Sequence, residues 1–190
     1  MDTTIALHLI DKYYSKYPLL KSILLTHSQQ VCTIALQVVD AHPEWAIKGL
    51  IDRSFIVQAS LLHDIGILFC NAPDIHCEGN HPYIEHGFLG AQLLRKEGLE
   101  KHAMVAERHT GSGLTKEDII AQHINIPIQD YLPISLEEKV ICFADKFFSK
   151  SKPTQQLTLE RIRQNMSRFG EASFNRWLAL EKLCISNNTP

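Results

Sequence analysis

Four of the ten histidines lie where they could meet at one centre. His27, His63, His86 and His109 each occupy the apolar face of a different segment with helical periodicity. Packing these helices into a bundle would point all four imidazoles inward. A buried imidazole must satisfy two ring nitrogens, so four of them without a partner would cost free energy. Neutral imidazole is a common metal ligand, and the pattern therefore predicts a buried metal site.

Two aspartates accompany these histidines. Asp64 follows His63 directly, and Asp145 lies in a predicted helix that opens with the capping pattern Ser135-x-x-Glu138. A buried carboxylate needs a cation, and six ligands are too many for one tetrahedral zinc ion. They suit two divalent ions with Asp64 as the bridge. We expect two divalent transition-metal ions, and the ligand types accept iron, manganese, cobalt, nickel or zinc.

The order of these residues resembles the HD superfamily of metal-dependent phosphohydrolases. The tetrad His63-Asp-Ile-Gly66 matches the HDIG subfamily letter for letter. Three later segments also resemble family blocks: His86-x-x-x-Gly90-Ala91, Arg108-His109-Thr110 and Phe143-Ala144-Asp145-Lys146. The chain is thereby identified as similar to small stand-alone HDIG proteins. The resemblance implies an all-α fold, an HD-domain helical bundle in a single domain.

The resemblance also implies how the ligands divide. His27, His63, Asp64 and Asp145 would hold the first metal, and Asp64, His86 and His109 would hold the second, as in the binuclear branch of the family. Asp64 and His63 would be the catalytic pair, with Asp64 orienting the attacking water. No Gly-Tyr-Pro tripeptide follows the tetrad, which weakens the case for a cyclic-di-GMP phosphodiesterase.

The expected activity is hydrolysis of a phosphate ester or phosphoanhydride by a metal-activated hydroxide. The expected partner is a phosphorylated small molecule, a nucleotide or a related compound. Two alternatives stay open. Some proteins of the superfamily use a di-iron centre as an oxygenase, and a non-catalytic metal- or nucleotide-binding sensor could carry the same ligands.

Two cations stand beside predicted ligands and could contact a substrate phosphate. Lys146 follows Asp145, and Arg108 precedes His109. For each, a solvated or carboxylate-paired side chain is an equally good interpretation. His81 competes with His86 as a ligand, but His86 has the better helical register with Gly90.

The composition restricts the class of protein, its partners and its location. The chain has 190 residues, 45% of them hydrophobic, and a net charge of -2, as expected for a globular domain with no obligatory nucleic-acid partner. Five cysteines without a C-x-x-C pair favour free thiols and a cytoplasmic location. Neither a signal peptide nor a membrane span is predicted.

The elements expected to position the site are helices. They are predicted over residues 24–40, through Ile56 to a stop at Gly66, from Pro82 to Gly98, over 100–110, from Thr115, and from Ser135. A last helical segment follows Pro153. No strand is predicted. The expected organisation is an N-terminal helix (1–19), an HD domain (20–150) and C-terminal helices (151–190) that pack on it and could support a homodimer.

Overall fold

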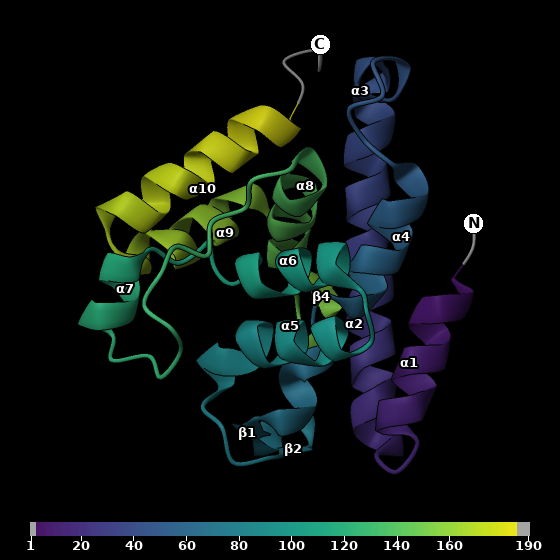
Figure 1. The fold of residues 1–190 in the computed structure, drawn as a ribbon. Helices are drawn as coiled ribbons and strands as arrows, with labels where there is room; N and C mark the ends of the chain where they lie inside the picture. Colours follow the sequence, from purple (N-terminus) through teal and green to yellow (C-terminus); the bar gives the residue numbers. More distant parts are fainter. Residues whose placement is uncertain (1–2, 186–190) are drawn as a thin grey trace.

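The computed structural model describes residues 3–185, and helices dominate it (Figure 1). The α-helices of this part of the chain are α1 (Thr4–Tyr14), α2 (Pro18–Ala41), α3 (Pro43–Ile47), α4 (Arg53–Leu62), α5 (His86–Lys96), α6 (Glu100–Arg108), α7 (Lys116–Ala121), α8 (Leu136–Ala144), α9 (Leu159–Met166) and α10 (Glu171–Cys184). The all-α fold class is confirmed.

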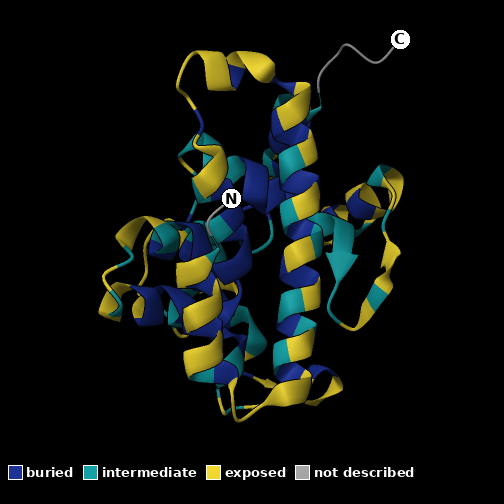
Figure 2. Ribbon diagram, turned by 90° about the vertical axis from the view of Figure 1, so that its right-hand side faces the viewer, coloured by how far each residue is buried: buried dark blue, intermediate teal, exposed yellow. Residues whose placement is uncertain are grey.

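The long helix α2 is the axis of the bundle. Pro18 opens it, where the missing amide proton of proline costs no helical hydrogen bond. It packs against α4 and α8, while α5 and α6 lie against each other as an antiparallel pair (Figure 1). Exposed and buried residues alternate along α2 in Figure 2, as expected for a helix with one face on the core.

Two apolar clusters meet on α2. One cluster contains Leu24 and joins α1, α4 and α5. The other contains Val31 and joins α8, α9 and α10, with Phe143 stacked on Trp177. His27 lies between Leu24 and Val31 in the sequence. The predicted metal centre is therefore positioned at the junction of the two halves of the core.

The chain leaves helix α4 earlier than predicted. The α-helix ends at Leu62, and a 3-10 helix, η1, covers Ile65–Phe69. The expected helix stop at Gly66 is therefore wrong. The backbone of Gly66 lies against α5, where a Cβ atom would meet the His86 carbonyl oxygen at 2.1 Å. This glycine permits a close approach of two segments rather than ending a helix.

The start of α5 also differs from the prediction. Pro82 precedes a short 3-10 helix, η3 (Tyr83–Glu85), and α5 begins only at His86. The capping pattern at Thr115 opens α7 as a reciprocal capping box. At Ser135 the side chain accepts a hydrogen bond from the Glu138 amide, and α8 follows.

Short strands are present that the sequence did not predict. They are β1 (Asn71–Ala72), β2 (Cys77–Glu78), β3 (Phe148–Ser149) and β4 (Lys152–Gln156), paired as two antiparallel hairpins. The segment at Pro153 thus forms β4, and α9 begins later, capped by Thr158. Strands β1, β2 and β3 have two residues each, below the length over which alternating polarity can be recognised, and the sequence of β4, KPTQQ, does not alternate apolar and polar residues. A further short 3-10 helix, η4 (Asp145–Phe147), connects α8 to β3.

None of the helices among residues 3–185 is long and apolar enough to cross a lipid bilayer.

Candidate metal centre

All six predicted ligands come together in the structure. His27 lies in the middle of α2, while the others lie at the ends of helices. The side chains of five of them are buried, that of Asp145 is 11% exposed, and Asp64 has no exposed surface at all. The ligand atoms form two groups that share Asp64, with the atoms of each group within 4.8 Å of one another: His27, His63, Asp64 and Asp145 in one, and Asp64, His86 and His109 in the other.

Three of the histidines are held by the same local contact. The Nδ1 atom of each lies 2.6–2.7 Å from the backbone carbonyl oxygen three residues earlier, and the pairs are His63 with Ser60, His86 with Tyr83, and His109 with Ala106. Ser60 and Ala106 lie in the last turns of α4 and α6, where carbonyl groups have no helical partner and accept these bonds readily. A donated Nδ1 proton leaves the Nε2 lone pair free, the arrangement found in metal-binding histidines.

The carboxylate of Asp64 lies between the imidazoles. Its Oδ2 is 3.2 Å from His27 Nε2 and 3.0 Å from His63 Nε2. Its Oδ1 is 3.3 Å from the Nε2 atoms of both His86 and His109. Asp145 Oδ1 lies on the first side only, 2.8 Å from His27 Nε2. Each oxygen of Asp64 therefore faces a different pair of histidines.

The polar atoms at this centre lack the partners that burial demands. His86 Nε2 and His109 Nε2 lie 3.0 Å apart, although both rings already donate from Nδ1, so two lone pairs face each other. His63 Nε2 and both oxygens of Asp64 are buried without a hydrogen bond, and Lys150 offsets the charge of Asp64 only through an ion pair with Oδ2. Unpaired buried acceptors are costly, and a divalent cation satisfies such atoms. The residues present therefore fit a metal and could hold metal ions.

Neighbouring charges shift the pKa values of the ligand side chains at this centre. Burial disfavours the charged form of Asp64, but His63 and Lys150 outweigh it and hold the pKa of Asp64 well below its usual range. Burial also opposes a charge on His63, yet the two aspartates raise the pKa of His63 to about 9. Burial lowers the pKa of His109 to about 4. At neutral pH His109 is thus neutral and Asp64 is ionised, whereas the proton on His63 would have to leave before this residue binds a metal.

Lys150 also belongs to this centre, although the sequence did not predict it there. Its Nζ lies 2.5 Å from Asp64 Oδ2, and the side chain is only 11% exposed. The same ammonium lies 5.8 Å from the centre of the Tyr83 ring. The only sequence signal was its position five residues after Asp145. The β3–β4 hairpin, which no pattern predicted, turns the lysine back toward the metal centre.

The two cations predicted as substrate contacts are placed differently. Lys146 forms an ion pair with Asp145 and donates to the His109 carbonyl oxygen at 3.1 Å. Arg108 lies 3.1 Å from an oxygen of the buried Glu138, which is the carboxylate-paired arrangement. His81, the competitor of His86, bonds Glu85 outside the centre and is 42% exposed.

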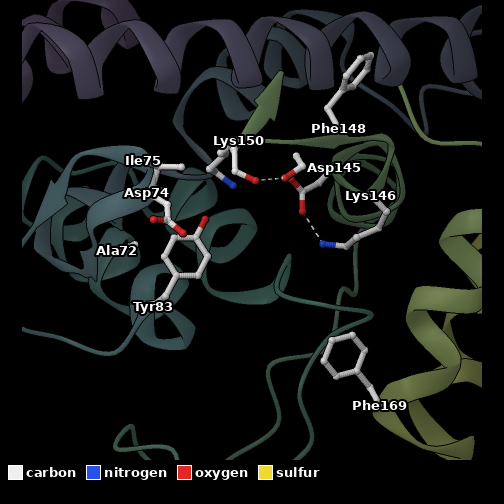
Figure 3. Close-up of a pocket in the computed structure, with 11 residues that line it drawn as sticks. Ala72, Asp74, Ile75, Tyr83, Asp145, Lys146, Phe148, Lys150 and Phe169 are labelled. Carbon is white, nitrogen blue, oxygen red and sulfur yellow. Dashed lines mark hydrogen bonds and ion pairs between the residues drawn. The ribbon is translucent and has the colours of Figure 1, made fainter. Parts of the chain in front are cut away.

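A cavity of about 530 Å³ adjoins Asp145, within the usual range for small-molecule sites. Figure 3 shows Tyr83 and Lys150 on one side of this cavity and Lys146 and Phe169 on the other. Phe148 also lines it. The cavity therefore combines two lysines with aromatic side chains next to the cluster of ligands.

Comparison with known protein families matches the HD domain over residues 24–149. An uncharacterised protein of Methanocaldococcus jannaschii is 41% identical over 103 residues, which cover 54% of this chain and 53% of that protein. A tRNA (cytidine(56)-2'-O)-methyltransferase of Picrophilus torridus is 30% identical over 131 residues, covering 68% of this chain and 33% of that protein. The methyltransferase of the same name in Thermoplasma volcanium is 27% identical over 148 residues, which cover 77% of this chain and 37% of that protein.

The matched segments thus span between about a third and about half of these curated relatives. The comparison with solved structures gave no match.

Proposed function

The chain belongs to the HD domain family, and from that membership we propose that it is a metal-dependent phosphohydrolase. The proposed substrate is a small molecule with a phosphate ester or phosphoanhydride, of the size of a nucleotide. The proposed site is the cluster around Asp64, with the adjoining cavity as the place where the substrate binds.

One observation carries this proposal: each oxygen of Asp64 faces a different pair of histidines. That arrangement suits two divalent ions with Asp64 between them, and it supports the proposed binuclear centre. Bound there, the ions would supply activation of a water molecule and neutralisation of the charge that develops at phosphorus.

The chain's own residues would position the reaction. Asp64 and His63 have no exposed surface, and Asp145 is the ligand that lines the cavity, so the proposed approach of the substrate is from that cavity. Tyr83, Phe148 and Phe169 offer aromatic surface to a planar base, which favours a nucleotide among phosphorylated compounds. Lys146 lines the same cavity, and its charge would attract an anionic substrate.

The test is metal analysis of the purified protein followed by turnover measurements on a panel of nucleotides and phosphoesters. Because two relatives are named as tRNA methyltransferases, the panel includes tRNA and RNA ends that carry a phosphate. We expect about two metal ions per chain and release of phosphate without oxygen consumption. Two irons with oxygen consumption and no phosphate release would identify an oxygenase instead. Bound metal with neither activity would favour a non-catalytic sensor.

The proposed location is the cytoplasm. All five cysteines are free in the structure, and four of them are buried. Free buried thiols are typical of proteins in a reducing compartment.

A further inference from the structure

The ammonium group of Lys150 forms an ion pair with Asp64. A metal ion bound to Asp64 would compete with Lys150 for this carboxylate. The ammonium is nearly buried, and the anion it contacts at 2.5 Å is Asp64, the carboxylate shared by both groups of ligands. A metal ion bound by Asp64 Oδ2 would take over the oxygen that Lys150 now neutralises. A buried ammonium that loses its carboxylate becomes costly unless another anion replaces it.

The surroundings of Lys150 restrict where that anion could come from. Tyr83 lies against the ammonium with its ring face, an uncharged contact. Asp145, the other carboxylate of the centre, is already shared by His27 and Lys146. The open side is the cavity, which Lys150 itself lines. Asp74 lines the same cavity but forms no ion pair with Lys150 within the described residues, and a ligand in the cavity can supply the negative oxygen.

We propose that Lys150 is a displaceable internal cation that neutralises Asp64 in the metal-free protein and binds a phosphate oxygen of the substrate once metal occupies the centre. This inference rests on the metal site of the proposed function. It assigns Lys150 as a substrate-binding residue supplied by the β3–β4 hairpin, beyond the six ligands. It also makes metal binding and anion binding interdependent, because one ammonium group takes part in both.

The experiment compares the wild-type chain with Lys150→Met, with Lys150→Gln as a second neutral variant that keeps a polar side chain. Lys152→Met is the matched control, because Lys152 lies two residues away on β4 and is exposed. Circular dichroism establishes that each variant is folded. Calorimetric titration then measures two affinities: that of the metal-stripped protein for Mn²⁺, and that of the Mn²⁺-loaded protein for orthophosphate.

Removing the competing ammonium should tighten Mn²⁺ binding about tenfold, since a like charge beside the carboxylate opposes the metal. Orthophosphate binding to the loaded protein should weaken about tenfold to a hundredfold, the loss expected for one charge-assisted hydrogen bond. Lys152→Met should change neither affinity. The proposal is overturned if either affinity is unchanged in both Lys150 variants, or if the loaded wild-type protein binds no orthophosphate.

Neither measurement depends on turnover, so the inference and the proposed function can fail separately. Both shifts without hydrolysis of any compound in the panel would support Lys150 as an anion-binding residue and reject the phosphohydrolase. Hydrolysis with unchanged affinities would support the enzyme and reject this role for Lys150.

Discussion

Gly66 packs directly against Gly90. A Cβ atom on Gly66 would lie 2.3 Å from the Gly90 amide nitrogen, well inside van der Waals contact. This contact lets η1, which follows Asp64, approach the first turns of α5, which begins with His86. The spacing between the shared carboxylate and one of its imidazoles therefore depends on two residues that have no side chain.

Gly66→Ala should accordingly damage both stability and the metal centre. The added methyl group meets backbone atoms that cannot rotate away, and we expect a loss of about 3 kcal/mol in the free energy of unfolding. Because His86 would be displaced, the bound metal should fall below the wild-type amount. Urea unfolding and metal analysis measure the two effects. Gly49→Ala is the control: its Cβ meets open space, so only the cost of a positive φ, about 1–2 kcal/mol, is expected there with metal content unchanged.

The division of ligands predicts a graded loss of metal. Asp145 belongs to one group and His86 to the other, whereas Asp64 belongs to both. Asp145→Asn and His86→Ala should each reduce bound metal by about one ion per chain, and Asp64→Asn should remove both, together with all turnover. Elemental analysis of the dialysed variants is the readout. Full metal content and undiminished turnover in folded Asp64→Asn would contradict the assignment of Asp64 as the shared ligand.

Removal of metal should lower the thermal stability of the wild-type chain. Binding to the folded state alone contributes about 3 kcal/mol when free metal exceeds its Kd a hundredfold, equivalent to about 5–11 °C in Tm for a chain of this size. Calorimetric scans with and without a chelator, followed by restoration of the metal, measure the difference. A Tm that does not respond to chelator or to added metal would show that the cluster holds no ion in the folded protein.

Arg108→Met should affect stability and leave substrate affinity alone. The guanidinium is paired with the buried Glu138, which also accepts a hydrogen bond from the Ile134 amide. Loss of one charge-assisted partner should cost about 2 kcal/mol. Arg53→Met, which breaks an exposed pair with Asp40, is the comparison and should cost less than about 1 kcal/mol. A raised KM in Arg108→Met would instead assign Arg108 to substrate binding.

The contrast between Arg108 and Lys150 shows what a linear sequence leaves undecided. Arg108 precedes a predicted ligand, His109, in the sequence, yet its side chain forms an ion pair with Glu138. Lys150 lies five residues beyond Asp145 and is nevertheless in contact with Asp64. Adjacent residues on a helix point about 100° apart, so being next to a ligand in the sequence does not place a side chain in the same site.

The sequence by itself determined the helical class of the fold and the set of six residues that come together around Asp64. It could do so because the four histidines share helical register with apolar residues that must meet in one core, and because the six residues resemble the blocks of the HD superfamily in order. Only the tertiary structure decided the early end of α4, the close contact of Gly66 with α5, the two hairpins and the place of Lys150. These features depend on contacts between segments far apart in the chain, and two-residue strands or a turn against a neighbouring helix leave no periodic signal in the sequence.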